Sequence, residues 1–283
     1  MYKIRITIGS LLLLTIGGLA YLDHYTKSYY ATSSVMILLI LAALWELLKI
    51  FENIEFKPFM KFAVTSSLIS FILILLRPSL QILQQKSVVE IFEVLILLSF
   101  FLLPIFRKDR YEIVKDLLIT ITGIIYTYYF LKYLVKIRLI GNNFDGIIYL
   151  VTIILIAKSM DIGGYLIGKA FGKHKLCPQI SPKKSWEGFV GGVVLTISVA
   201  ILMLNSFQLL QKHFTLVTMV IFAIFIGLLS LLGDLSESML KRICNVKDSN
   251  SLIPEFGGIL DLVDSLIFVA PFAYFFLNYL IIN

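Results

Sequence analysis

The sequence predicts an all-α polytopic membrane protein with about nine transmembrane helices. Of its 283 residues, 59% are hydrophobic and only 15% are charged, and the mean hydropathy is +0.92. A typical soluble domain has roughly 25% charged residues. The long apolar runs lack the period-2 alternation of strands, and a backbone in lipid must satisfy its own hydrogen bonds. We therefore expect the runs to be helices.

Each expected span is an apolar run of about 20 residues, the length that crosses the hydrocarbon core. The runs occupy residues 7–22, 33–51, 58–76, 88–106, 115–134, 146–168, 187–205, 214–233 and 259–280. The first run follows Lys3 and Arg5, as the apolar part of a signal peptide would. The absence of a convincing cleavage site and the many spans that follow favour a retained helix.

The distribution of basic residues predicts a cytoplasmic N-terminus. In that orientation most of the 25 Lys and Arg residues lie on the inner side, as the positive-inside rule requires, while Lys132 and Arg138 fall at an outer loop. The net charge of +7 then faces anionic lipid headgroups, and no nucleic-acid partner is expected. With no recognisable targeting extension, the expected location is a bacterial-type inner (plasma) membrane.

The two cysteines do not predict a disulfide or a zinc site. Cys177 and Cys244 both fall in expected cytoplasmic loops, far apart in sequence and away from any Cys or His cluster. We expect reduced, structural thiols.

The two parts of the chain differ in character. Residues 1–140 are expected to form an N-terminal transmembrane region of about five helices, and residues 141–283 a catalytic region of about four helices with two cytoplasmic loops. In the first region, Glu46 and Glu90 are interpreted as carboxylates that reach the membrane interface. In the second, polar residues collect at the cytoplasmic helix ends, so the candidate site is expected at that face.

The first candidate cluster lies in KSMDIGGYLIGKAFGKHKLCPQISPKKSWEG, residues 158–188. Lys158, Asp161 and Tyr165 are spaced i, i+3 and i+7 and therefore share one helix face. The glycines between and after them allow another backbone, or a ligand, to come close; they are Gly163, Gly164 and Gly168.

The loop that follows is a candidate cradle for phosphate oxygens. Ser181, Lys183 and Lys184 supply a hydroxyl and two ammonium groups just before a span. A lysine loop that only sets the topology is the alternative. The presence of Lys158 and Asp161 within a span argues against it, since topology requires neither.

The second cluster is SLLGDLSESMLKR, residues 230–242. Asp234, then Glu237 or Ser238, and then Lys241 fall on one helical stripe, which leads to the basic pair Lys241 and Arg242. A helix end that emerges into water would explain the basic pair, but it explains Asp234 less well.

The third cluster is KRICNVKDSNSLIPEFGGILDLVDS, residues 241–265. Pro254 stops the loop, and Gly257 and Gly258 lie where the next helix is expected to begin. Asp261, Asp264 and Ser265 follow at i, i+3 and i+4, and we expect them on one helix face.

These carboxylates, with Asp234 opposite, suit a hard divalent cation such as Mg²⁺, which binds one or two carboxylates together with phosphates and water. An ion-pair network without a ligand is the alternative. A membrane-embedded carboxylate cluster with lysines at the cytoplasmic surface favours phosphoryl or nucleotidyl transfer on a lipid.

Residues 238–265, SMLKRICNVKDSNSLIPEFGGILDLVDS, resemble the signature of the phosphatidate cytidylyltransferase (CDP-diacylglycerol synthase) family. The upstream stretch DIGGYLIGKAFGKHKL…ISPKKSWEG resembles that family's cytoplasmic loop. The matching signature positions are Ser238, Lys241, Arg242, Lys247, Asp248, Pro254, Gly257, Gly258, Asp261 and Asp264. Asn250, Phe256 and Leu262 depart from the pattern, which has a small residue, His and Arg there.

The resemblance implies the reaction CTP + phosphatidate → CDP-diacylglycerol + pyrophosphate in phospholipid biosynthesis. It implies Mg²⁺ as cofactor, with a monovalent cation such as K⁺ as a further candidate, and it places the enzyme among membrane lipids. A homodimer is left open. The expected chemistry is in-line attack by a phosphatidate oxygen on the α-phosphorus of CTP.

The resemblance also implies roles for individual residues. The implied catalytic residues are Asp234, Asp261, Asp264, Asp248 and Lys241, with Asp234 and Asp261 as the metal ligands. The implied phosphate-binding residues are Ser181, Lys183, Lys184, Lys241, Arg242, Lys247, Gly257 and Gly258. The supporting residues are Lys158, Asp161, Ser238 and Ser265.

Three other functions are weighed against this one. A CTP-dependent polyprenol or lipid kinase would share the metal and basic groups but attack the γ-phosphorus. A transporter would use the intramembrane Asp and Lys residues as ion sites, but the halves are dissimilar and the polar groups gather at one face. A catalytically silent scaffold is supported only by the departures at Phe256 and Leu262.

Overall fold

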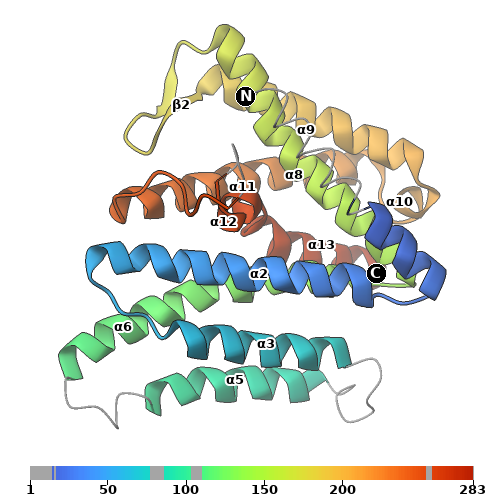
Figure 1. The fold of residues 1–283 in the computed structure, drawn as a ribbon. Helices are drawn as coiled ribbons and strands as arrows, with labels where there is room; N and C mark the ends of the chain where they lie inside the picture. Colours follow the sequence, from blue (N-terminus) through green and yellow to red (C-terminus); the bar gives the residue numbers. More distant parts are fainter. Residues whose placement is uncertain (1–14, 16, 77–85, 103–109, 253–256, 283) are drawn as a thin grey trace.

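The computed structural model describes residues 15, 17–76, 86–102, 110–252 and 257–282, and most of them are helical (Figure 1). The elements of the N-terminal part are α2 (Tyr30–Ile50), the 3₁₀ turn η1 (Phe51–Ile54), α3 (Met60–Leu76), α5 (Lys86–Leu102), α6 (Arg110–Gly123), the π-helical segment η3 (Ile124–Tyr129) and α7 (Phe130–Arg138).

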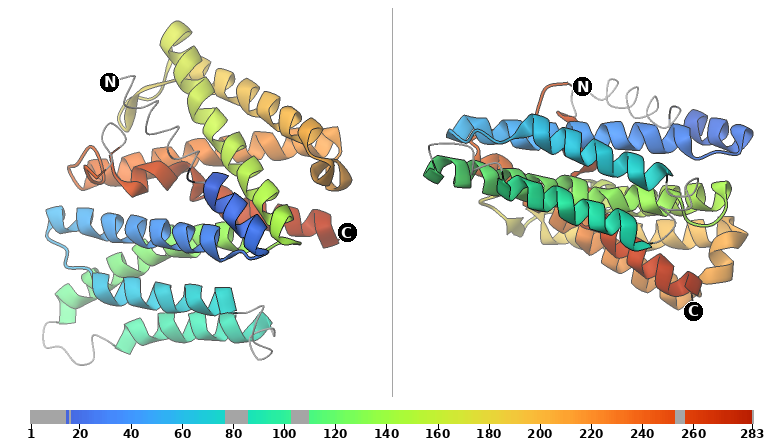
Figure 2. Two further views of the ribbon diagram at one scale, coloured as in Figure 1. Left: turned by 45° about the vertical axis from the view of Figure 1, so that its right-hand side comes forward. Right: turned by 90° about the horizontal axis from the view of Figure 1, so that it is seen from below.

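The C-terminal part contains further helices and the two strands that the structure describes. Its elements are α8 (Asn143–Phe171), β1 (Lys175–Cys177), β2 (Ser181–Ser185), α9 (Trp186–Ser206), α10 (Gln208–His213), α11 (Leu216–Ile243), α12 (Ile259–Val263), the 3₁₀ turn η4 (Asp264–Leu266) and α13 (Val269–Ile282). In the views of Figures 1 and 2, the pair α3 and α5 lies at the opposite end of the molecule from the β1–β2 hairpin.

Six helical segments within the described residues are long and apolar enough to cross a membrane. They are Tyr30–Ile54, Glu112–Arg138, Phe144–Phe171, Trp186–Ser206, Leu216–Ile243 and Ile259–Ile281. The protein is therefore a mostly helical, multi-pass membrane protein, as predicted. Helix α3 is shorter, α5 covers part of the run predicted at 88–106, and most of the run predicted at 7–22 lies outside the described residues.

The glycines of α8 bring its backbone against that of α9, as the sequence predicted. A Cβ on Gly163 would lie 2.7 Å from the carbonyl oxygen of Gly191, and a Cβ on Gly188 would lie 2.7 Å from that of Gly164. Small residues allow this approach in a membrane, where helices associate by packing rather than by burial from water. The close contact fixes the hairpin, which connects these two helices, at the C-terminal end of α8.

The hairpin is the part of the structure that an all-α prediction lacks. Strands β1 and β2 pair antiparallel, with Lys175 opposite Ser185 and Cys177 opposite Ser181. The hairpin is held to α9 at its base, where Trp186 N–H donates to the His174 carbonyl at 2.9 Å. The Ser185 side chain also caps α9 by accepting from Gly188 N–H at 3.1 Å. The loop that was predicted to carry the lysines is thus a β-hairpin anchored to the start of α9.

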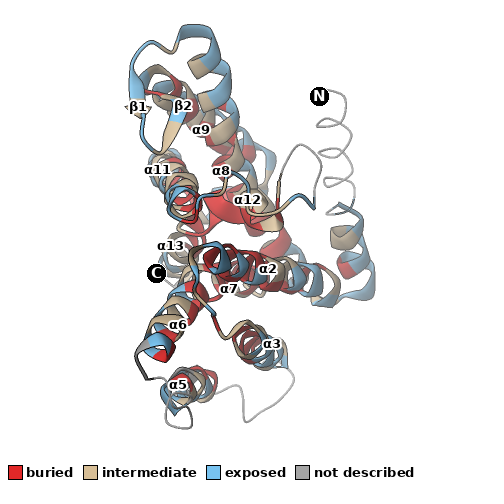
Figure 3. Ribbon diagram, turned by 60° about the vertical axis from the view of Figure 1, so that its left-hand side comes forward, coloured by how far each residue is buried: buried red, intermediate tan, exposed pale blue. Residues whose placement is uncertain are grey.

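The last predicted span is a broken helix. Helix α12 ends at Val263, the 3₁₀ turn η4 follows, and α13 begins at Val269. Irregular backbone at membrane depth is tolerated where protein buries it, and Ser265 and Leu266 are buried. Figure 3 shows α12 between α11 and α2. The expectation that Asp261, Asp264 and Ser265 share one helix face is therefore wrong, because they belong to two segments.

Two basic residues assigned to an outer loop are buried instead. Lys132 and Arg138 on α7 are each 1% exposed. Lys132 Nζ lies 2.6 Å from Glu93 on α5, and Arg138 Nη2 lies 2.9 Å from Asp23. These two charges are therefore compensated inside the protein, and removing either partner would leave an uncompensated buried charge; the side of the membrane on which they lie stays a prediction.

Candidate active site

A cavity of about 250 Å³ lies where α8, the hairpin, α9 and α11 meet. Its lining includes the predicted polar residues Asp161, Ser181, Lys183, Lys184 and Asp234. They come from three segments that are far apart in sequence. The structure thus brings the first predicted cluster, residues 158–188, into contact with Asp234, which belongs to the second cluster, residues 230–242.

Lys184 on β2 pairs with Asp234 on α11, with Nζ and Oδ2 2.7 Å apart. Successive side chains of a strand point to opposite sides; Lys183 is exposed, whereas Lys184 is half-buried. Asp234 is also half-buried, and it accepts from the Ser238 hydroxyl one turn later at 3.3 Å. The hairpin therefore delivers one ammonium group directly to an intramembrane carboxylate.

Lys158 on α8 is the centre of a second group of contacts. Its Nζ donates to Ser265 Oγ at 2.6 Å and lies 3.8 Å from carboxylate oxygens of both Asp161 and Asp264. The i, i+3 pairing of Lys158 with Asp161 is as predicted. The break in the last span carries Asp264 and Ser265 to Lys158, so α8 and η4 are joined across the site.

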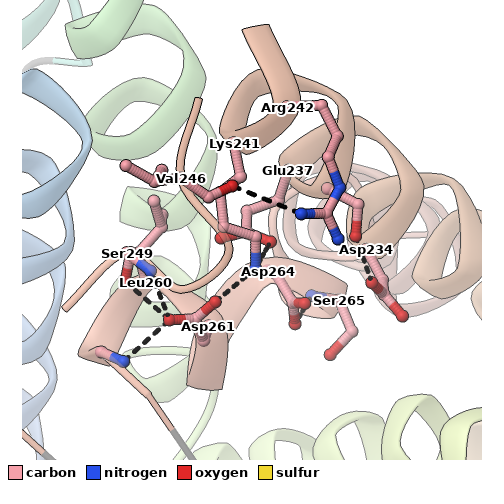
Figure 4. A network of polar contacts seen from close by, with 12 residues as sticks. Asp234, Glu237, Lys241, Arg242, Val246, Ser249, Leu260, Asp261, Asp264 and Ser265 are labelled. Atoms are coloured by element: carbon pink, nitrogen blue, oxygen red, sulfur yellow. Dashed lines mark hydrogen bonds and ion pairs between the residues drawn. The ribbon is translucent and has the colours of Figure 1, made fainter. Parts of the chain in front are cut away.

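Lys241 near the end of α11 is the centre of a third group (Figure 4). Its Nζ lies 2.6 Å from Glu237 Oε2 and donates to Asp261 Oδ1. Glu237 is fully buried, with no exposed surface. The predicted stripe on α11 therefore divides: Asp234 and Ser238 face the hairpin, and Glu237 and Lys241 face α12.

Asp261 organises the loop that precedes it. Its Oδ2 accepts from Ser249 N–H at 3.0 Å, from Ser249 Oγ at 2.7 Å and from Gly258 N–H at 2.7 Å. The bond to Gly258 caps the first turn of α12. Gly257 has φ of +93°, a conformation that favours glycine. Gly257 is thus favoured by the turn that this carboxylate holds.

The remaining predicted site residues lie in the last turn of α11 and on the loop after it. Arg242, Lys247 and Asp248 are exposed, and the Arg242 guanidinium donates to the Val246 carbonyl at 3.4 Å. Leu262, where the family pattern has Arg, is half-buried in α12. Pro254 and Phe256 lie outside the described residues. Of the predicted phosphate-binding groups, those that line the cavity are Ser181, Lys183 and Lys184.

Glu46 on α2 is a site residue that the sequence interpretation missed. It was interpreted as a carboxylate that reaches the interface, but it is only 2% exposed. It accepts from Ser249 Oγ at 3.0 Å and from Leu260 N–H at 2.8 Å. The interface interpretation is therefore wrong for Glu46, whereas Glu90 is exposed on α5. The signal available in the sequence was an acidic residue within an apolar span.

The donor set fits a hard cation only together with a substrate. Within the described ranges, no three Asp, Glu, His or Cys side chains meet as a ready metal cage. Mg²⁺ does not need one, since one or two carboxylates with phosphates and water are enough. Asp234, which lies beside Lys184, and Asp264, which lies beside Lys158, offer carboxylate oxygens as ligands. Asp261, the other predicted ligand, is held by Lys241 and by its own loop.

The arrangement can bind an anionic, metal-chelating group where α8, the hairpin and α11 meet. Ammonium groups in the half-buried cavity attract phosphate oxygens, and the neighbouring carboxylates attract a cation that those oxygens also bind. This combination of charges suits transfer at phosphorus.

Comparisons with known proteins match this chemistry. The model of the cytidylyltransferase family matches residues 3–280. A phosphatidate cytidylyltransferase of Bacillus subtilis (strain 168) is 38% identical over 195 residues, which is 68% of this chain and 68% of the relative.

Two further relatives with the same name align over shorter segments. That of Haemophilus influenzae is 39% identical over 136 residues, which is 48% of this chain and 47% of the relative. That of Synechocystis sp. is 46% identical over 129 residues, 45% of this chain and 43% of the relative. The aligned segments thus span about half the length of these two relatives.

Proposed function

Because this chain belongs to the cytidylyltransferase family, we propose that it is a phosphatidate cytidylyltransferase, which converts CTP and phosphatidate to CDP-diacylglycerol and pyrophosphate. The relatives of that name support this activity. The observation that carries the proposal is the pairing of Lys184 with Asp234 in a cavity that Ser181 and Lys183 also line. It places groups for a nucleotide phosphate beside a carboxylate at the helix ends.

The lysines of the hairpin bind the triphosphate of CTP. Lys183 is exposed and meets the nucleotide first, while Lys184 reaches into the cavity. Ammonium groups that are already in place stabilise the charge that develops on the transferring phosphorus and on the pyrophosphate leaving group. This role follows for Lys184 because its ammonium group is held by Asp234 before the substrate arrives.

Phosphatidate supplies its own nucleophile. Its phosphate oxygen is ionised at neutral pH, so the attack on the α-phosphorus of CTP needs no general base. The chain then has to align two anionic groups that repel each other, and alignment alone contributes several orders of magnitude in such reactions. Lys158, which bridges α8 and η4, neutralises charge beside Asp161, which lines the cavity, and beside Asp264.

Mg²⁺ belongs to this proposal as the cation shared by enzyme and nucleotide. Asp234 and Asp264 would hold it, with Asp161 and Ser238 in support. When bound, the cation neutralises phosphate charge and polarises the reacting phosphoryl group. The predicted ligand Asp261 acts in this proposal through Lys241 and the signature loop. A monovalent cation such as K⁺ and a homodimer remain predictions from the sequence.

The activity requires a membrane location, because both phosphatidate and its product stay in the bilayer, and the bacterial-type inner membrane stays the prediction from the sequence. The expected orientation, with the hairpin and the loop after α11 in the cytoplasm, gives the cavity access to CTP. The division at residue 140 stays a prediction, and α2 contributes to the site from the N-terminal side through Glu46.

The position of label in CTP distinguishes cytidylyl transfer from lipid phosphorylation. Purified protein in detergent is incubated with phosphatidate, Mg²⁺ and CTP labelled at either the α- or the γ-phosphorus. The proposal predicts that only the α-label enters the lipid and that pyrophosphate is released. Entry of the γ-label alone, with a lipid alcohol as acceptor, would assign a CTP-dependent kinase instead.

A further inference from the structure

Glu46 reaches across the molecule to the signature segment. Its oxygens accept from three donors: Oε2 from Leu260 N–H at 2.8 Å and from Ser249 Oγ at 3.0 Å, and Oε1 from Asn250 Nδ2 at 3.2 Å. All three donors lie between residues 249 and 260, whereas Glu46 itself lies on α2. One buried carboxylate therefore connects the N-terminal region to the loop and helix that carry Asp261.

Gly258 makes room for this carboxylate. A Cβ at that position would collide with Glu46 Oε2 and with Ser249 Oγ. The backbone of Gly258 has φ of −94°, so conformation alone does not demand glycine there. The requirement comes from the close approach of Glu46. The second glycine of the pair thus has a packing reason that lies on another helix.

The contacts of Glu46 converge on Asp261. Ser249 Oγ lies between the two carboxylates, 3.0 Å from Glu46 Oε2 and 2.7 Å from Asp261 Oδ2. The Leu260 N–H that Glu46 accepts belongs to the residue just before Asp261. Asp261 in turn accepts a hydrogen bond from Lys241 Nζ, which also pairs with Glu237. A displacement of Glu46 would therefore move Asp261 and Lys241 together.

We propose that Glu46 is a positioning residue for the transfer reaction: it holds Ser249, Asn250 and Leu260 and thereby fixes the Asp261–Lys241 pair at the end of α11. The inference rests on the proposed function. Glu46 itself touches no reacting atom in this account. Its role resembles that of groups behind metal and phosphate ligands, whose loss typically lowers activity or metal affinity by about 10- to 100-fold.

The donors around Glu46 permit a designed rescue. A carboxylate accepts from all three groups, but the amide in Glu46→Gln has one oxygen and one NH₂ group. If the amide oxygen of this variant side chain keeps the hydrogen bonds from Leu260 N–H and Ser249 Oγ, its NH₂ group faces the NH₂ group of Asn250. Two donors then meet, and the third hydrogen bond is lost. Asn250→Asp supplies an acceptor there and restores the bond. Asn250→Asp alone places two carboxylates together, so each single variant is impaired and the pair recovers.

The variants are compared in detergent-purified full-length protein with α-labelled CTP and phosphatidate. We expect Glu46→Gln to lower kcat about 10- to 100-fold and to raise the Mg²⁺ concentration for half-maximal rate, with a much smaller change in KM for CTP. The double variant recovers most of the rate. Glu93→Gln is the matched control: it removes another buried carboxylate, the partner of Lys132, and is expected to lower the thermal midpoint without changing the Mg²⁺ requirement.

A second readout does not depend on turnover. Lys247 is exposed on the loop that Glu46 holds, and cleavage by trypsin there reports how often the loop opens. We expect faster cleavage at Lys247 in Glu46→Gln, a normal rate in the double variant, and no change in Glu93→Gln. If Glu46→Gln does not fold, Asn250→Asp alone carries the same test, since its added carboxylate repels Glu46.

The outcomes separate the two claims. An inactive wild-type protein that is folded would reject the proposed function and leave the trypsin result to decide whether Glu46 holds the loop. An active wild type in which the variants keep their kcat, Mg²⁺ requirement and cleavage rate would overturn the positioning role alone. Failure of the double variant to recover would also overturn it, because the hydrogen-bond pattern would then not explain the loss.

Discussion

Lys184 on β2 and Asp234 on α11 form an ion pair 2.7 Å long, and both residues line the cavity between α8, the hairpin, α9 and α11. The two residues belong to clusters separated by a whole span, α9. Their contact exists because glycines bring α8 and α9 together and so place the hairpin above α11. Both side chains are half-buried and remain partly open to solvent, so the pair contributes little to stability and its main consequence is for binding.

Replacing Lys184 should impair nucleotide use more than folding. Lys184→Ala removes a preplaced ammonium group, and we expect kcat/KM for CTP to fall about 10²- to 10³-fold. Lys175→Ala on β1 is the control, since Lys175 is exposed on the same hairpin. Steady-state rates at varied CTP, with thermal midpoints for both variants, measure the difference. Equal effects of the two variants would mean that the hairpin contributes only general positive charge.

Removal of the divalent cation should stop the reaction, and Asp264→Asn should make the enzyme harder to saturate with Mg²⁺. The neutral amide is a poorer ligand, so the half-saturating Mg²⁺ concentration should rise about 10- to 100-fold. Rates are measured after chelation and over a Mg²⁺ titration. Full activity in excess chelator would contradict the metal proposal for every residue named in it.

The sequence predicted the composition of this site better than its geometry. The i, i+3 spacing of Lys158 and Asp161 survives as a contact, because both lie on the regular helix α8. Asp261 and Asp264 were expected on one face by the same rule. The break after Val263 separates them, since the contacts of η4 with Lys158 and α11 outweigh the continuity of one helix.

Glu46 shows what a local pattern cannot supply. Its partners are more than 200 positions away along the chain, so no helical spacing could indicate them. An isolated acid in an apolar run is compatible with reaching the interface or with a buried partner, and only the packing of α2 against α12 decides between these. The hairpin was missed for a related reason: its strands are too short and polar for an alternating pattern to identify them.

The packing of α8 against α9 should be sensitive to one added methyl group. Gly163→Ala places a Cβ 2.7 Å from the Gly191 carbonyl oxygen, and we expect a loss of about 1–3 kcal/mol from overpacking. Gly17→Ala is the control, because a Cβ there meets nothing within 4 Å. Thermal unfolding in detergent compares them. An unchanged midpoint for Gly163→Ala would show that the two helices can separate without cost.

The thiols report both burial and orientation. Cys244 is fully buried, and burial raises the pKa of its thiol. The thiolate fraction at neutral pH is thereby lowered, so a maleimide should react much faster with Cys177, which is half-buried on β1. With a membrane-impermeant maleimide, labelling of Cys177 should occur in inverted vesicles and not in intact cells. Labelling in intact cells would reverse the predicted orientation.

The central claim is that the cavity containing Asp234 carries cytidylyl transfer to phosphatidate. The most direct measurement compares wild type with Asp234→Asn for the initial rate at which α-labelled CTP enters the lipid phase. Both proteins must first show the same thermal midpoint in detergent. The account predicts lipid label and released pyrophosphate for wild type, and a rate lower by at least about 10³-fold for the variant. Comparable labelling by the two proteins would contradict it.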